Sequence, residues 1–238
     1  FVPGEGFSEL MSVDYSQIEM RIMAHLSQDE GLIAAFNSGE DLHKTMASLV
    51  FGVPIDQVDS ELRNRIKATS YGLAYGLSPF GLSKQLGVSV EEARDLHKDY
   101  FARFGRIGKY LREVVEDARA DGFTQTMWGR RRYFPELQST VRRVRDMAER
   151  AALNAPIQGS AADIFKIAMI GVQAELLDGG FASRMVLQVH DELVLEIAPG
   201  EEEAVQKIVT KAMGAAADMS VPLDVAVGVG KSWRTAAH

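Results

Sequence analysis

Hydrophobic positions along the chain change period several times, and these changes predict the order of its elements. Met11 to Tyr15 form a short apolar run, which is typical of a buried strand, and a helical pattern follows from Gln17 to Leu26. Helical periodicity then continues to about Gly122. It is broken at Gly39, Pro54, Gly76 and Gly87. This stretch predicts a helical lobe.

The second half of the chain mixes strands and helices. Thr124 to Trp128 predict a short strand closed by Gly129, and a long helix is expected from about Pro156 to Leu177. Two consecutive glycines after this helix provide its stop signal. A later helix from Glu201 to about Ala217 and a strand near Leu223 to Val227 complete the predicted order.

A change to period two between these helices predicts a β-hairpin. Its arms are Arg184 to Val189 and Leu193 to Ile197, and its tip is His190, Asp191 and Glu192. Strands near both ends of the chain therefore enclose the helical stretch. This order predicts an α+β fold, in which an antiparallel sheet carries a large helical lobe.

Composition is that of an ordinary globular protein. The chain has 238 residues, of which 46% are hydrophobic, and no repeat or Ser/Gly linker divides it. No apolar run reaches the roughly 18 residues of a membrane span, and the first ten residues lack the features of a signal peptide. We therefore expect no membrane contact. Because the chain starts at Phe1 without a methionine, we also expect a further segment upstream.

The absence of cysteine limits the possible chemistry. Disulfides and thiolate metal sites are excluded, so any metal must bind oxygen or imidazole, and a reducing cytoplasm fits this composition. The net charge of -7 argues mildly against a general nucleic-acid binder. However, residues 130–150 contain seven arginines and three acids. This run is either a local track for phosphates or a solvated helix face.

Two carboxylates far apart in the sequence are candidate metal ligands. Asp14 ends the first predicted strand, and Asp191 lies at the hairpin tip. Taken alone, Asp14 is better explained as a helix N-cap than as a ligand, and Asp191 is better explained as a turn residue exposed to water. Strand ends of one sheet can converge, however, and two nearby carboxylates favour a bound cation. Two divalent ions there would suit phosphoryl transfer.

A third set of residues lies on one predicted helix. Arg63, Lys67, Tyr71 and Tyr75 recur every four residues, so two cations and aromatic rings share a face. Such a face suits a triphosphate and a base. The alternative is an ordinary surface helix with scattered basic residues.

Three segments in order, DYSQIEMR, RNRIKATSYGLAYG and QVHDE, resemble motifs A, B and C of the bacterial DNA polymerase I family, the family A DNA polymerases. The resemblance extends over essentially the whole chain, including TMWGRRRYFPEL and NAPIQGSAADI. It implies a DNA-directed DNA polymerase, a nucleotidyltransferase of replication and repair. Such an enzyme adds deoxynucleotides to a primer 3′-hydroxyl and releases pyrophosphate.

The resemblance also implies a division of the chain. Residues 1–40 and 123–238 would belong to the palm, and residues 41–122 to the helical fingers. The thumb and any nuclease domains would lie upstream of Phe1, so we expect the isolated fragment to bind primer–template poorly. We further expect a monomer in the bacterial cytoplasm, associated with the nucleoid through DNA.

Individual roles follow from the matching positions. Asp14, Asp191 and the backbone carbonyl of Tyr15 would hold two magnesium ions, with Glu192 as an auxiliary catalytic carboxylate. His43, Arg63 and Lys67 would bind the triphosphate, and Lys67 would protonate the pyrophosphate. The nucleotide site would also include Glu19 as steric gate against ribose, Tyr71, and Tyr75 near the templating base. The DNA contacts would be Arg150, Asn154, Gln158 and His190 in the minor groove.

One residue departs from the family pattern. Most bacterial members resemble one another in having phenylalanine where this chain has Tyr71, so we expect weak discrimination against dideoxynucleotides. Three rival functions use similar parts: a single-subunit RNA polymerase, a DNA-binding subunit without catalysis, and a metal-dependent phosphohydrolase. Glu19 disfavours the first, the complete set of charged residues the second, and the tyrosine stripe the third.

Overall fold

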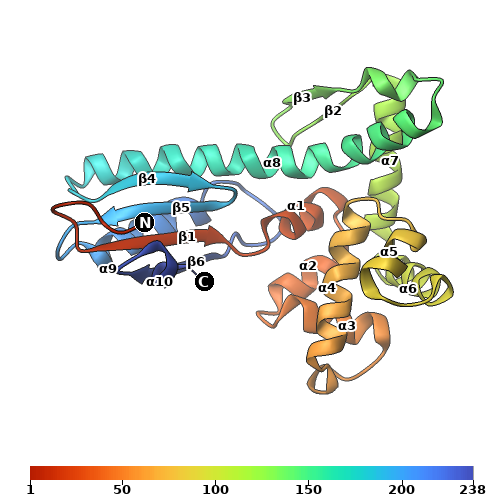
Figure 1. Ribbon diagram of the computed structural model, residues 1–238, viewed down its shortest axis with the longest axis horizontal. Helices are drawn as coiled ribbons and strands as arrows, with labels where there is room; N and C mark the ends of the chain where they lie inside the picture. Colours follow the sequence, from red (N-terminus) through yellow and green to blue (C-terminus); the bar gives the residue numbers. More distant parts are fainter. Residues whose placement is uncertain (238) are drawn as a thin grey trace. The chain divides into compact units, whose positions relative to one another are not determined.

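The structure is a computed structural model that describes residues 1–237. The chain folds into two compact units (Figure 1). The first contains residues 1–18 and the chain from Ala161 onward, and the second contains Glu19–Ser160. None of the helices among the described residues is long and apolar enough to cross a membrane.

The first unit is built on a four-stranded sheet in the order β4-β5-β1-β6. Its strands are β1 (Glu9–Tyr15), β4 (Arg184–Val189), β5 (Glu192–Ile197) and β6 (Val225–Gly230). Every neighbouring pair is antiparallel, so the first strand of the chain lies between two of the last. The predicted α+β fold with an antiparallel sheet is confirmed, and so is the hairpin.

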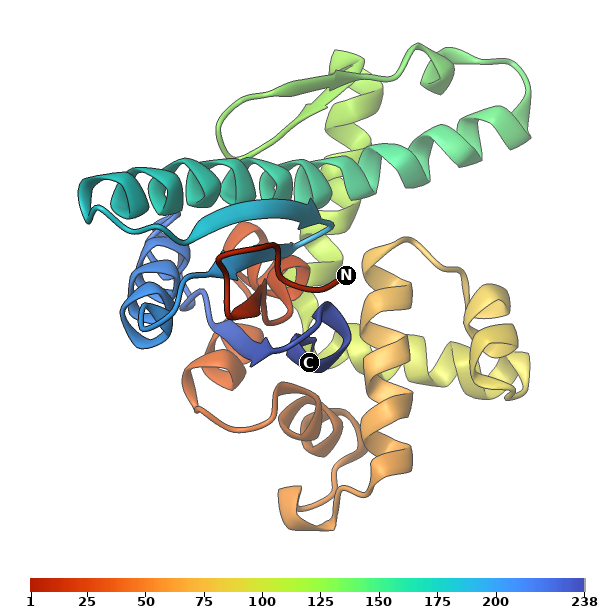
Figure 2. The ribbon, with the colours of Figure 1, turned by 60° about the vertical axis from the view of Figure 1, so that its left-hand side comes forward.

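Side chains alternate between the two faces of this sheet. The C-terminal part of α8 (Arg142–Asp178) runs along one face of the sheet (Figure 2). On this helix-covered face, Tyr15 packs against Phe165 of α8 with ring centroids 5.9 Å apart. The Tyr15 hydroxyl also donates to the carbonyl oxygen of Met213 in α9 (Glu202–Gly214), at 2.8 Å. Valines of β6 at 225, 227 and 229 pair with residues of this same face. This face is therefore the main core of the unit.

The opposite face, which we call the site face, carries Leu10, Ser12 and Asp14 of β1. The residues of β6 that pair with them are small: Gly230, Gly228 and Ala226. The short helix α10 (Trp233–Ala236) packs on this face in a small apolar cluster. The rest of the site face is therefore free of bulky side chains from β6.

The second unit is mainly helical and follows the predicted lobe. Its helices are α1 (Ile18–Ser27), α2 (Glu30–Asn37), α3 (Leu42–Phe51), α4 (Ser60–Ala74), α5 (Pro79–Leu86), α6 (Val90–Arg103), α7 (Gly105–Asp121) and the first part of α8, with short 3-10 turns at Ile55–Gln57 and Pro135–Gln138. Side chains of Asp41, Asp59, Ser78 and Ser89 cap α3 to α6 in turn. The predicted breaks at Pro54, Gly76 and Gly87 all fall between helices.

One prediction for residues 123–160 was wrong, and one strand in this segment was not predicted. The helix expected from Pro156 begins at Arg142 and continues through that proline. A proline removes only one donor from a helix, and here Ala152, Ala155 and Ile157 are buried on both sides of it. The arginine run also contains a strand, β3 (Arg131–Tyr133), which pairs with β2 (Phe123–Gln125).

The compact units have different limits from the expected palm and fingers. Their boundaries fall at 18/19 and 160/161, whereas the predicted limits were 40/41 and 122/123. Residues 19–40 and 123–160 belong to the second unit because they pack mostly with its helices. The division into palm and fingers stays a prediction about function.

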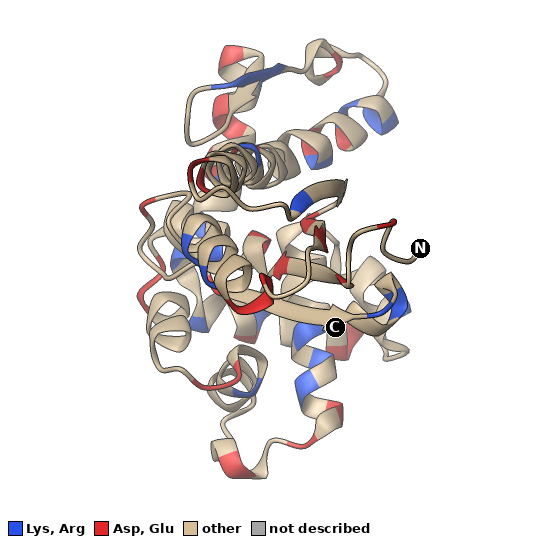
Figure 3. Ribbon diagram, turned by 90° about the vertical axis from the view of Figure 1, so that its left-hand side faces the viewer, with Lys and Arg blue, Asp and Glu red and all other residues tan. Residues whose placement is uncertain are grey.

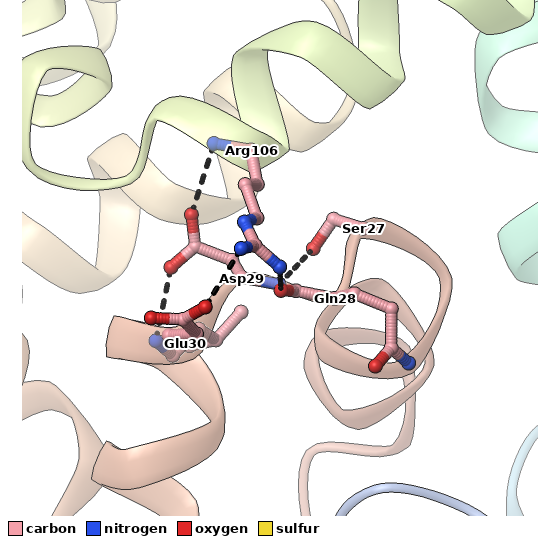
Figure 4. A network of polar contacts seen from close by, with 6 residues as sticks. Ser27, Gln28, Asp29, Glu30 and Arg106 are labelled. Atoms are coloured by element: carbon pink, nitrogen blue, oxygen red, sulfur yellow. Dashed lines mark hydrogen bonds and ion pairs between the residues drawn. The ribbon is translucent and has the colours of Figure 1, made fainter.

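One buried carboxylate connects two helices of the second unit, α2 and α7 (Figure 4). Asp29, only 3% exposed, caps α2 by accepting a hydrogen bond from the Leu32 amide at 3.1 Å. Its other oxygen accepts from the backbone amide of Arg106 in the first turn of α7, also at 3.1 Å. The N-cap residue of α7, Phe104, makes no side-chain cap of its own. Asp29 therefore caps two helices at the corner where α1 ends.

We expect Asp29→Ala to destabilise the second unit by about 1–3 kcal/mol, because one buried and one partly buried amide lose their acceptor. The measurement is the melting temperature of the protein, compared with Glu30→Ala. Glu30 makes only an exposed ion pair with Arg106, so its removal should change stability by less than about 1 kcal/mol. Equal effects of the two substitutions would contradict the shared-cap interpretation.

Candidate active site

The strand order of the first unit brings the two predicted metal ligands to the same end of neighbouring strands in the sheet. Asp14 on β1 lies directly opposite Glu192, the first residue of β5. Directly paired α-carbons are about 5 Å apart and consecutive ones about 3.8 Å, so the α-carbons of Asp14 and Asp191 lie within roughly 9 Å. When two aspartate α-carbons are this close, their carboxylates can reach a shared pair of cations.

Asp191 is placed by a tight turn. Because Val189 pairs with Glu192, only His190 and Asp191 remain in the connection between β4 and β5. His190 has φ 52°, a left-handed conformation that glycine adopts more readily. Glu192, predicted at the hairpin tip, is instead a strand residue on the site face. This difference matters because it fixes the direction of its side chain.

Glu192 is held by two donors on the same oxygen. The hydroxyl of Ser12 donates to Oε1 at 2.6 Å, and the indole Nε1 of Trp233 donates to it at 2.5 Å. Ser12 is buried on the site face beside Asp14. Glu192 is therefore oriented by its neighbours and is not a freely moving acid.

The donor set at this end of the sheet fits hard divalent cations. Asp14 and Asp191 offer carboxylate oxygens, which magnesium prefers, and Ala226 beside Asp14 leaves space above the sheet. Within residues 1–237, no group of three or more His, Cys, Asp or Glu side chains is arranged to hold a metal ion. Side-chain ligands at Asp14 and Asp191 would therefore need substrate oxygens to complete the coordination. The Tyr15 side chain is buried in the core, where burial raises its pKa, so only its carbonyl oxygen could take part.

In the second unit, α4 carries the predicted stripe of cations and tyrosines. Arg63, Lys67 and Tyr71 lie on this one helix at spacings of four, and Tyr75 is its C-cap residue. Arg63 contacts Asp41 through two of its nitrogens: Nε lies 3.0 Å and Nη2 2.8 Å from Oδ2. This pairing lowers the pKa of Asp41, although burial opposes the shift. Lys67 is exposed and available to solvent.

His43 is buried next to this stripe. It is 1% exposed, and its ring centroid lies 6.2 Å from that of Tyr71. Burial, with the positive charges of Arg63 and Lys67, lowers its pKa to about 4. A neutral imidazole can donate one hydrogen bond but carries no charge. Both ring nitrogens lack a hydrogen-bond partner among the described residues.

Three predicted site residues meet at the C-terminal end of α4. The hydroxyl of Tyr75 donates to Glu19 Oε2, and the side chain of Gln158 lies close to that hydroxyl. Burial, followed by the contact with Glu19, raises the pKa of Tyr75, so it remains a donor at neutral pH. The predicted steric gate, templating-base residue and minor-groove residue are thus brought together.

The remaining DNA-binding candidates fall into both units. Arg150 and Asn154 lie one turn apart on α8, and Gln158 follows by the same spacing. His190 belongs to the first unit. The ribbon of β3 and of the start of α8 carries the colour of Lys and Arg in Figure 3. Arg131, Arg132 and Arg145 of this run make contacts within the protein. The run is therefore not a single helix face, because part of it forms β3, and its binding of phosphates stays a prediction.

Sequence reasoning missed three residues that orient the predicted ones. Ser12 and Trp233 hold Glu192, and Asp41 pairs with Arg63. Ser12 precedes Asp14 by two residues. Because residues two apart in a strand share a face, the sequence could have predicted that Ser12 lies on the same face as Asp14. Trp233 stands in the short C-terminal segment outside every recognised motif.

Neighbouring carboxylates at the end of two paired strands are typical of proteins that bind divalent cations. The family can be stated more closely. Residues 1–235 match the model of DNA polymerase family A, and the chain belongs to this family.

Individual relatives agree. The chain is 65% identical to DNA polymerase I of Mycobacterium tuberculosis over all 238 residues, and 46% identical to that of Pseudomonas aeruginosa over 233. It spans about a quarter of these relatives, 26% and 25% of their length. A solved structure, the POL domain of Pol1 from M. smegmatis in complex with DNA primer-template and dNTP, superposes with a TM-score of 0.97. That structure is 61% identical and covers the whole chain, which corresponds to 42% of its own.

The lowered pKa of His43 predicts a loss of stability in acid. Between pH 6.5 and about 4 the unfolded chain binds a proton at this residue and the folded chain does not. Stability should therefore fall by at most about 3 kcal/mol as the pH decreases through this window, with no further loss below it. The measurement is the melting temperature against pH for the protein and for His43→Gln. Parallel curves would contradict the prediction.

Proposed function

We propose that this chain is the nucleotidyl-transfer portion of a template-directed DNA polymerase, with primer–template DNA and deoxynucleoside triphosphates as substrates. The observation that carries the proposal is the pairing of Asp14 with Glu192, which brings Asp14 and Asp191 to the same end of the sheet. Family membership and the M. smegmatis relative, named as a complex with DNA primer-template and dNTP, support it.

Asp14 and Asp191 are proposed to bind two magnesium ions, with the carbonyl of Tyr15 as a further ligand. When bound, these ions would lower the pKa of the primer 3′-hydroxyl and neutralise charge on the phosphates. The protein contributes a rigid position for each carboxylate. Asp14 is fixed in a central strand, and Asp191 is fixed by a two-residue turn.

The α4 stripe is proposed to bind the triphosphate. Arg63 and Lys67 supply positive charge at the phosphates, and Lys67 is the candidate donor of a proton to the leaving pyrophosphate. His43 can donate one neutral hydrogen bond to a phosphate oxygen, which would satisfy a ring nitrogen that has no partner within residues 1–237. Phosphoryl transfer requires mainly this alignment and charge neutralisation.

Sugar and base selection are proposed to involve the cluster around Tyr75. Its hydroxyl holds Glu19, which would occupy the space of a ribose 2′-hydroxyl. Tyr71 lies one turn earlier on the same helix, where its hydroxyl could replace the contact that a dideoxynucleotide lacks. Arg150, Asn154, Gln158 and His190 would donate to minor-groove acceptors that all base pairs share. Such contacts test the shape of a base pair without reading its sequence.

Primer extension by the full-length protein with magnesium tests the function. We expect Asp191→Ala to reduce synthesis on the order of a thousandfold while primer–template affinity stays within about twofold. Asp178→Ala, at the exposed end of α8, removes a carboxylate elsewhere in the same unit and should extend normally. Near-normal synthesis by Asp191→Ala would exclude the proposed site. Equal use of ribonucleotides would favour an RNA polymerase.

Asp41 provides a test of the triphosphate site. Its carboxylate holds Arg63 and adds a negative charge near the proposed phosphates. We expect Asp41→Asn to lower KM for the deoxynucleotide about two- to fivefold with little change in kcat, since asparagine can still cap α3. Asp59→Asn, at the cap of α4 itself, is the matched control and should leave KM unchanged. A raised KM in Asp41→Asn would show that Asp41 is needed to orient Arg63.

A further inference from the structure

The C-terminal helix α10 is seated directly on the sheet of the proposed metal site. It packs on the site face with Leu10 and Val194, through Ala236 and Trp233. Gly230 makes this close approach possible, because a β-carbon there would lie 2.7–2.8 Å from backbone atoms of Thr235 and Ala236. The backbone of α10 therefore lies where a side chain of residue 230 would stand. The position of Trp233 is set by this seat.

Trp233 and Ser12 hold Glu192 in a particular direction. Both donate to Oε1, at 2.5 and 2.6 Å. Ser12 lies two residues before Asp14 on the same face of β1. The carboxylate of Glu192 is thus drawn back along β1. The strand end that carries the Asp14 side chain and the Tyr15 carbonyl lies in the other direction.

This direction matters because Glu192 stands directly opposite Asp14. A glutamate at that position has the reach and charge to become a third carboxylate ligand for a nearby cation. Two donors on one of its oxygens neutralise part of its charge and restrict its rotamers. No other strand residue paired with Asp14 carries a charge, since the neighbour on β6 is Ala226.

We propose that Trp233, together with Ser12, is a positioning residue that keeps Glu192 from coordinating the divalent cations. Asp14 and Asp191 are then the only carboxylate ligands, and the remaining positions stay open for substrate oxygens. The inference rests on the proposed function, because it concerns the cations of that site. It assigns a role to the C-terminal helix.

Loss of Trp233 should change cation affinity and the rate of synthesis in opposite directions. Release of Glu192 adds negative charge and a further ligand, so the cations bind more tightly. The same release fills positions that the nucleotide needs, so synthesis becomes slower. If Trp233 only packed against its neighbours, such as Phe1 with ring centroids 5.7 Å apart, its loss would weaken cation binding and synthesis together.

The experiment uses the full-length protein and measures cation binding separately from activity. Fe²⁺ replaces Mg²⁺ and, with ascorbate and peroxide, cuts the backbone beside the ion, which should give fragments ending near residues 14 and 191. Competition by Mg²⁺ then reports the affinity at this site alone. We expect Trp233→Phe and Ser12→Ala each to need about three- to tenfold less Mg²⁺ for half suppression, with primer extension slowed roughly tenfold.

A second substitution identifies Glu192 as the intermediary. In an E192Q background, Trp233→Phe should no longer raise cation affinity, because the amide has no charge to release. Gly230→Ala, which displaces α10 without altering Trp233 itself, should raise affinity as Trp233→Phe does. Trp128→Phe is the matched control: this indole is 48% exposed in the other unit and should change neither quantity.

Unchanged or weaker cation binding in both Trp233→Phe and Ser12→Ala overturns the proposal, and so does a gain that persists in the E192Q background. Failure of the proposed function is a separate result. If the unaltered protein does not extend a primer with magnesium, the polymerase assignment fails, whereas the cleavage measurement still reports whether Trp233 controls Glu192.

Discussion

The antiparallel pairing of β1 between β5 and β6 is the constraint on which the proposed chemistry depends. It places Asp14 opposite Glu192 and next to the turn that contains Asp191. Because side chains alternate along a strand, a slip of one residue would send Asp14 into the core and Val13 to the site face. Met11, Val13 and Tyr15, which are all buried on the helix-covered face, oppose that slip. The register of β1 therefore determines both the packing of the core and the placement of the carboxylates.

Orientation by neighbouring groups recurs in both units. Glu192 is held by Ser12 and Trp233, Arg63 by Asp41, and Glu19 by Tyr75. In each pair a charged side chain near the proposed substrate has its direction set before the substrate binds. For Glu19 such preorganisation would lower the entropy lost on binding. For Glu192 the fixed direction is proposed instead to keep the carboxylate away from the cations.

Much of this arrangement could be predicted from the sequence. The period-two arms of the hairpin, the glycine and proline breaks, and the spacing of Arg63, Lys67 and Tyr71 all depend on local patterns, and each is present in the structure. The course of α8 through Pro156 could not be read locally, because burial on both sides outweighs one missing hydrogen bond. The partners of Glu192 were equally inaccessible, since Trp233 and Ser12 are brought together only by strand pairing and the seat at Gly230.

The small residues of β6 leave space on the site face but lower the stability of the strand. Ala226, Gly228 and Gly230 leave room above Asp14 and admit α10, yet glycine contributes little to the intrinsic stability of a strand. β6 is also the edge of the sheet, with one side of its backbone unpaired by any strand in the described chain. The space beside the carboxylates is thus bounded by a strand with low intrinsic stability. β6 therefore depends on its pairing with β1 and on the helices that pack against it.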